Sequence, residues 1–249
     1  MLSRLRRNCE RQHPYLQCDV PSRSGHHLLA KCLRDYWGER FRYCEWYGHC
    51  RRSPCSNLKT NWQKNHDFQL SLLRVPERRY VVQYRHPIEG IVSWYLWELK
   101  WGIPADRNGL LKTRILRKIP KWPSIARLLN PDSEARWHEV FWLKLDFWKE
   151  FVCKWVIDNT YHNAYLLPCD RFTSQGEREV KSVIRFVCPE TVVDEVKIEW
   201  IVAQHRFSRT KSVGHFRYYD AKLIRQVEDD VREEMALLGI ETILKEPST

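Results

Sequence analysis

The fold is decided by the stretch Tyr15-Leu-Gln-Cys-Asp-Val-Pro-Ser-Arg-Ser-Gly-His-His-Leu-Leu29. It starts with a short apolar run, passes through a small polar turn, and continues with apolar residues at a helical spacing. We therefore predict a strand at 15–20 and a helix at 26–38. A glycine lets the backbone turn sharply, and the first N–H groups of a helix lack internal partners, so such a turn suits an anion. The competing interpretation is an ordinary connection with a serine N-cap.

A second stretch repeats this arrangement. Arg79-Tyr-Val-Val-Gln-Tyr-Arg85 is apolar enough for a buried strand, and it runs into His86-Pro87 and a segment that contains Ser93. Because proline suits the first turn of a helix, we predict a helix at 87–101. Both polar turns would then follow strands.

The remaining pattern alternates strands with helices. We expect strands at 41–47 and 164–168, and helices at 175–186, at 221–238 before Gly239, and from Ser133 to about residue 158. We further expect a loose arm at 1–14, a surface insertion at 48–60, and an irregular flap over the site at 102–132. The alternation predicts one α/β domain over 1–249, with a parallel sheet between two layers of helices and ligands at the carboxyl ends of its strands.

Composition narrows the function. The 249 residues carry a formal net charge of +11, which favours an anionic partner such as a nucleotide, a nucleic acid or an acidic polymer. The basic residues are spread along the chain, which disfavours a nucleic-acid stripe. There is no apolar run near the roughly 20 residues of a membrane helix, and the basic N-terminus has no apolar core like that of a secretory signal. We therefore expect a cytoplasmic protein.

The cysteines point to a reducing compartment. There are nine, an odd number with scattered spacing, which is typical of unpaired or partly paired thiols. Cys44, Cys50 and Cys55, with His49 among them, could form a metal site or a disulfide loop. Their spacing lacks the Cys-x2-Cys pair of common zinc sites, so we expect no metal there.

Together, the two strand–turn–helix stretches resemble the sulfotransferase family, which transfers a sulfuryl group from 3′-phosphoadenosine 5′-phosphosulfate (PAPS). The first turn is similar to its 5′-phosphosulfate loop, and the second stretch is similar to its 3′-phosphate motif through Arg85, Pro87 and Ser93. The segment 207–217 is similar to a degenerate form of the family's late Arg-Lys-Gly loop. The resemblance covers most of 15–239 and implies a P-loop-like sulfotransferase fold.

The resemblance implies a set of PAPS-binding residues. They are Arg23, Ser24, Gly25, His26 and His27 around the phosphosulfate, Arg85, Ser93 and Arg209 on the 3′-phosphate, and Phe207 against the adenine. Arg23 would also neutralise the leaving oxygen. The histidines stand where small polar residues are usual, and Leu28 stands where many members carry a tryptophan, so the chain resembles a divergent member. The competing interpretation for Arg85 is an ion pair with Glu89.

The resemblance also implies a catalytic base. The family often has Lys-x-His before the 3′-phosphate strand, and Lys64-Asn-His66 fits, with His66 taking the proton and Lys64 stabilising negative charge. A rival alignment uses Lys59-Thr-Asn61 and leaves no histidine. Glu45 or Glu98 could be the base instead, and Asp67 could orient His66.

We therefore predict an enzyme that moves a sulfuryl group from PAPS to a hydroxyl of a carbohydrate, glycolipid or small alcohol, leaving the desulfated product PAP. No metal is expected to take part, and the protein is expected to be a monomer or a homodimer.

The tryptophans around Trp94, Trp97, Trp101 and Trp122 could be core residues or an acceptor surface. A P-loop kinase is disfavoured because Gly-x4-Gly-Lys-Ser/Thr is absent. A polyanion or nucleic-acid binder, or a catalytically degenerate PAPS-binding homologue, are the alternatives.

Overall fold

The computed structural model describes the following residues: 16–19, 24–46, 50, 55, 57, 59–66, 78–102, 116, 119, 132–157, 163–205, 216, 218 and 220–243. The expected arm at 1–14 and nearly all of the expected flap at 102–132 lie outside this part of the chain.

The described residues form a five-stranded sheet in which every pairing is parallel. Its strands, in spatial order, are β2 (Tyr43–Glu45), β3 (Trp62–Asn65), β1 (Leu16–Asp19), β4 (Arg79–Tyr84) and β5 (Ala164–Pro168). Leu16 of β1 is in register with Trp62 on one side and Arg79 on the other. The carboxyl ends of all these strands therefore meet at one edge of the sheet.

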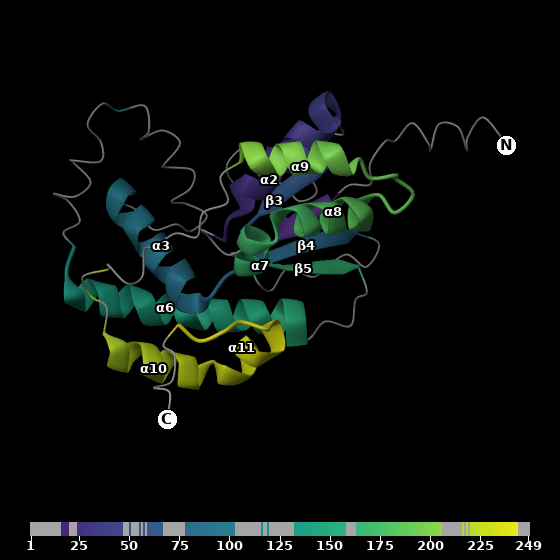
Figure 1. Ribbon diagram of the computed structural model, residues 1–249. Coiled ribbons are helices and arrows are strands. Elements are labelled where there is room, and N and C mark those ends of the chain that lie inside the picture. Colours follow the sequence, from purple (N-terminus) through teal and green to yellow (C-terminus); the bar gives the residue numbers. More distant parts are fainter. Residues whose placement is uncertain are drawn as a thin grey trace.

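Helices cover both faces of the sheet (Figure 1). One face carries α2 (His26–Trp37), α7 (Cys169–Ser174), α8 (Gly176–Val187) and α9 (Glu195–Gln204). The other carries α3 (Pro87–Trp101), α6 (Glu134–Val152), α10 (Ala221–Asp230) and α11 (Arg232–Leu238). A 3-10 turn, η1 (Gly38–Arg40), follows α2, and a π-helical turn, η2 (Cys153–Ile157), extends α6.

The alternation of side chains along β4 divides the core. Val81 packs with the helices of the first face, whereas Tyr84 packs with those of the second, and both are buried. This alternation is expected of a strand that is covered on both sides, because successive side chains point to opposite faces. The structure therefore confirms the prediction of an α/β protein with a parallel sheet.

Local signals set several of the element ends. Pro87 is the first residue of α3, and Gly102 ends it in the left-handed conformation. The Ser133 hydroxyl accepts a hydrogen bond from the backbone N–H of Arg136 at 3.3 Å, as an N-cap does. The helix predicted at 221–238 is instead divided at Val231, and the helix α9 was not predicted.

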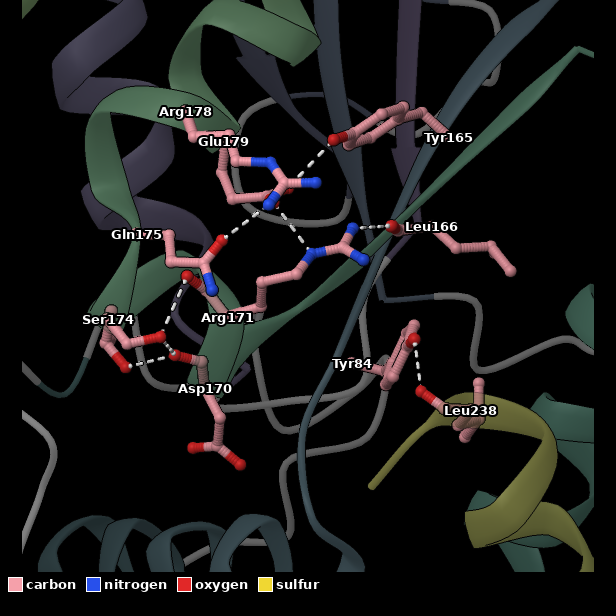
Figure 2. Close-up of polar contacts among 11 residues, drawn as sticks. Tyr84, Tyr165, Leu166, Asp170, Arg171, Ser174, Gln175, Arg178, Glu179 and Leu238 are labelled. Carbon is pink, nitrogen blue, oxygen red and sulfur yellow. Dashed lines mark hydrogen bonds and ion pairs between the residues drawn. The ribbon is translucent and has the colours of Figure 1, made fainter. Parts of the chain in front are cut away.

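A buried carboxylate ties α7 and α8 to β5 (Figure 2). Glu179 of α8 accepts a hydrogen bond from the Tyr165 hydroxyl at 2.8 Å and forms an ion pair with Arg171 Nε at 2.7 Å. Arg171 also donates to the carbonyl of Leu166 at 3.0 Å. These contacts fix α7, whose first residue, Cys169, lies beside the turn before α2.

Within the described residues, no helix has both the length and the apolar character needed to cross a membrane.

Candidate functional site

The turn before α2 has a backbone that only glycine adopts easily. Gly25 has φ 84° and ψ 5°, which is the left-handed region. A Cβ at this position would lie 3.2 Å from Cys169 Sγ and 3.3 Å from Gln83 Nε2. The backbone of the turn is therefore packed tightly against the end of β4 and the start of α7.

The amino end of α2 is suited to an anion. Gly25 is its N-cap, and among the described residues no side chain caps this end and no acidic residue lies in its first turn. The positive end of the helix dipole is thus not offset there by a described carboxylate. Ser24 is buried, and Arg23 lies outside the described residues. The serine N-cap of the competing interpretation is not found, because Gly25 takes that position.

His26 and His27 differ in their surroundings. His27 is exposed, whereas His26 is buried with its ring stacked on Tyr43 and its Nδ1 3.2 Å from Cys18 Sγ. Burial, with the nearby charge of Lys64, holds the pKa of His26 well below its usual value, so the ring is neutral at pH 7. The His26 side chain packs in the core under α2, and its Nε2 has no hydrogen-bond partner among the described residues.

Arg85 follows β4 and is also buried. Its Nε donates to Glu89 Oε2 at 2.8 Å, which is the pairing expected in the competing interpretation. A guanidinium has five N–H donors, so a bond through Nε does not use up its donor capacity. The Arg85 carbonyl accepts from Trp148 Nε1 at 3.2 Å, which fixes the backbone between β4 and α3.

One small cavity joins the two predicted phosphate-binding elements. Ser24 from the first turn and Arg85 from the second both line it, together with Pro87, Gly90, Ile91, Trp94, Lys144, Phe147 and Trp148. Ser93 is partly exposed on α3 and does not line this cavity. Phe207 and Arg209 lie outside the described residues. The fold thus brings Ser24 and Arg85 to one cavity.

A second group of polar side chains lies at the same edge of the sheet. Lys64 near the end of β3 forms an ion pair with Glu45 at the end of β2, with Nζ and Oε1 2.7 Å apart. His66 follows β3 directly, and its Nε2 lies 3.8 Å from the same Glu45 oxygen. Lys64 and His66 are both buried. Their charges act on His26, so this group adjoins the turn before α2.

The Glu45 carboxyl is held ionised. Burial by itself raises its pKa, but the ammonium of Lys64 and the adjacent His66 outweigh burial and lower the pKa to about 2. A carboxylate of such low basicity is a poor proton acceptor at neutral pH. It is better suited to orienting a neighbouring imidazole.

The residues of the alternative base assignments lie elsewhere in the fold. Asn61 precedes β3, at the amino end of the strand, and its side chain bonds the carbonyl of Arg40 at 2.7 Å and the N–H of Arg42 at 2.9 Å. Glu98 forms an ion pair with Lys144 at 3.2 Å between α3 and α6. Asp67 lies outside the described residues.

Gln83 is a candidate site residue that the sequence analysis did not identify. Its side chain is fully buried beside Gly25, and neither of its amide atoms has a hydrogen-bond partner among the described residues. A buried amide normally finds partners, so one without any beside a possible ligand turn suggests a role there. The signal was a single polar residue inside an apolar strand.

Trp94, one of the two tryptophans that line the cavity, is a core residue. Trp94 is buried, the Lys144 ammonium lies 4.0 Å from the centre of its ring, and Phe147 packs against its edge. Trp97 and Trp101 are partly exposed, and Trp122 lies outside the described residues.

The thiols of Cys44, Cys50 and Cys55 form the one described group of histidine, cysteine or acidic residues close enough to hold a metal.

Comparison with known proteins gives a likeness in fold. No protein-family model matches the chain, and no curated protein matches its sequence. Among solved structures, the chain is similar to mouse sulfotransferase SULT7A1 complexed with PAP, at a TM-score of 0.57 and 11% identity, over 91% of this chain and 88% of that chain. The chain therefore has a sulfotransferase-like fold.

Proposed function

We propose that the protein is a PAPS-dependent sulfotransferase, with a single domain in which helices flank a P-loop-like parallel sheet. The observation that carries this proposal is the convergence of Ser24 and Arg85, from two separate strand–turn–helix units, at the carboxyl edge of the sheet. The fold likeness to a sulfotransferase complexed with PAP supports the same reading.

The described residues of the two turns suit a nucleotide with one anionic group at its 5′ end and another at its 3′ position. The left-handed Gly25 removes the side chain that would block close approach, and the start of α2 presents a positive dipole end. In the proposal, this turn holds the 5′-phosphosulfate with Arg23, and Arg85 with Ser93 holds the 3′-phosphate. Arg209 and Phe207 would complete the nucleotide site.

The transfer step follows from the second polar group. The acceptor hydroxyl oxygen attacks the sulfur, the bond from sulfur to the phosphate oxygen breaks, and PAP leaves with that electron pair. His66 takes the hydroxyl proton, and the ionised Glu45 at 3.8 Å stabilises the imidazolium that results. Lys64 stabilises charge on the transferring group. The acceptor would be a hydroxyl of a carbohydrate, glycolipid or small alcohol.

Donor binding is tested by calorimetric titration with PAP at two salt concentrations, with adenosine 5′-phosphate and ATP as controls. We expect binding that requires the 3′-phosphate, is lost in Arg85→Ala and is kept in Arg178→Ala, an exposed arginine on α8. Absence of PAP binding by the folded wild-type protein would refute the proposal. Steeply salt-dependent binding of RNA or DNA in place of PAP would establish the polyanion binder.

Catalysis is tested with labelled PAPS and a panel of hydroxyl acceptors. His66→Ala should bind PAP but lose transfer, whereas His138→Ala, which changes a half-exposed histidine on α6, should keep both. Full turnover by His66→Ala would remove His66 from the mechanism. PAP binding without transfer to any acceptor would indicate a degenerate homologue.

A further inference from the structure

Three cysteine thiols converge beside β2. Cys44 Sγ lies 3.1 Å from Cys50 Sγ and 3.4 Å from Cys55 Sγ. All three sulfur atoms lie within 4.8 Å of one another. Cys44 and Cys55 are buried and Cys50 is partly buried, so the group is screened from solvent.

These distances suit a shared metal ion. Thiolates that bind tetrahedral zinc with bonds of about 2.3 Å have sulfur atoms about 3.8 Å apart. Two of the three sulfur–sulfur distances here, 3.1 and 3.4 Å, are a little shorter than this spacing, and the third is at most 4.8 Å. A disulfide would join two of them at about 2.05 Å and leave the third thiol buried beside it.

Hydrogen-bond donors are aimed at two of the three sulfur atoms. Gln63 Nε2 donates to Cys50 Sγ at 3.1 Å, and the Thr60 hydroxyl donates to Cys55 Sγ at 3.4 Å. Donors aimed at the sulfur atoms stabilise their negative charge and orient them, as the outer groups around bound metals do. Gln63 belongs to β3, and Thr60 lies in the segment just before that strand.

We propose that Cys44, Cys50 and Cys55 bind one zinc ion, with the fourth position taken by a ligand outside this set. The absence of a Cys-x2-Cys pair argued against zinc in the sequence. The fold brings the cysteines together without such a pair. Cys44 lies in β2, and Cys50 is held beside that strand by a β-bridge with Trp46 and by a hydrogen bond from its N–H to the Glu45 carbonyl at 3.2 Å.

The bound zinc would stabilise the pairing of the edge strand β2 with β3. Cys44 is in register with Gln63, and the next pair along the same ladder is Glu45 with Lys64. A metal at the first pair therefore holds the β2–β3 pairing that places the second. This inference stands whether or not the protein transfers sulfuryl groups.

The first test is the metal content of protein grown with added zinc and purified under reductant without chelator. We expect about one zinc per chain, as for one structural site, measured by inductively coupled plasma mass spectrometry. Cys44→Ser, Cys50→Ser and Cys55→Ser should each lower it. Cys188→Ser, which changes a partly buried cysteine outside the cluster, should not.

A second test does not depend on how the variants fold. Wild-type protein stripped with chelator is titrated with Co²⁺, and we expect a thiolate-to-cobalt charge-transfer band that added Zn²⁺ removes, and a fall in thermal midpoint on stripping that Zn²⁺ reverses. Lack of both zinc and the cobalt band in folded protein would overturn the proposal. So would stoichiometric copper in place of zinc, or a Cys44–Cys50 disulfide found by alkylation and peptide mass spectrometry in protein purified under reductant.

Discussion

Replacing Gly25 with alanine tests whether the turn before α2 is as tightly packed as its geometry implies. The change places a Cβ 3.2 Å from Cys169 Sγ and 3.3 Å from Gln83 Nε2, on a residue whose φ is 84°. Two separate costs follow. One is the left-handed backbone, and the other is crowding by two side chains.

The two costs can be separated by a matched glycine. A left-handed conformation costs a residue with a Cβ about 1–2 kcal/mol. Overpacking of a dense interior adds about 1–3 kcal/mol. Gly239 is also left-handed, with φ 62° and ψ 36°, but a Cβ there meets nothing within 4 Å among the described residues. Gly239→Ala should therefore cost about 1–2 kcal/mol and Gly25→Ala about 2–5 kcal/mol.

Urea unfolding of both variants gives this comparison directly. A double-mutant cycle then identifies the crowding, because Cys169→Ala removes one of the two obstructing groups. In that background Gly25→Ala should cost at least about 0.5 kcal/mol less than it does alone. Equal costs for the two glycine variants, together with no coupling to Cys169, would refute the tight packing of the turn.

Three further changes test other contacts. Glu45→Gln should make the free energy of unfolding less sensitive to acid. Despite burial, the ion pair with Lys64 lowers the pKa of Glu45 from 4.5 to about 2. The stabilisation is therefore complete above pH 5 and is lost as pH falls toward 2. The loss is roughly 3 kcal/mol, measured by urea unfolding across that range. Glu179→Gln should lower stability by about 1–3 kcal/mol, because Arg171 and Tyr165 lose a buried charged partner. Ser133→Ala should cost about 1 kcal/mol through loss of the α6 cap, as seen in the thermal midpoint.

Each of these changes has a control. Glu39→Gln should leave the acid profile intact, and Glu177→Gln, on the exposed side of α8, should leave stability near that of the wild type. Ser133→Asp keeps a capping oxygen and should restore most of the loss. A Glu45→Gln variant with the acid sensitivity of the wild type would contradict the assignment of a depressed pKa.

The sequence predicted those elements whose ends carry local signals. The helix Pro87–Trp101 and the strand Ala164–Pro168 have the predicted bounds, because a proline or a change of hydrophobic pattern sets each end. The helix α9 was missed because Val196 and Trp200 are exposed on it, which blurs the amphipathic pattern. The break at Val231 is a change in backbone within a continuous apolar pattern, so periodicity alone did not reveal it.

The sequence placed both polar turns at the carboxyl ends of strands but did not predict which strands are neighbours. Ser24 and Arg85 line one cavity because β1 and β4 are adjacent in the sheet. The pairing of Lys64 with Glu45, and the convergence of the three thiols, depend on how β2 and β3 are aligned. That register is set by tertiary packing rather than by any local residue pattern.

The order of the strands has a consequence for how the chain folds as it is made. β1, the first of the described strands in chain order, lies at the centre of the sheet, and both of its edges are paired only after Trp62 and then Arg79 have been made. The face of β4 that carries Tyr84 is covered still later, because the Tyr84 hydroxyl donates to the carbonyl of Leu238, near the end of the described residues. Such long-range pairings fold slowly and leave apolar strand edges open in the nascent chain. Synthesis therefore leaves the edges of β1 unpaired until β3 and β4 have emerged, and a chaperone that shields residues 16–37 during that interval should raise the yield of folded protein.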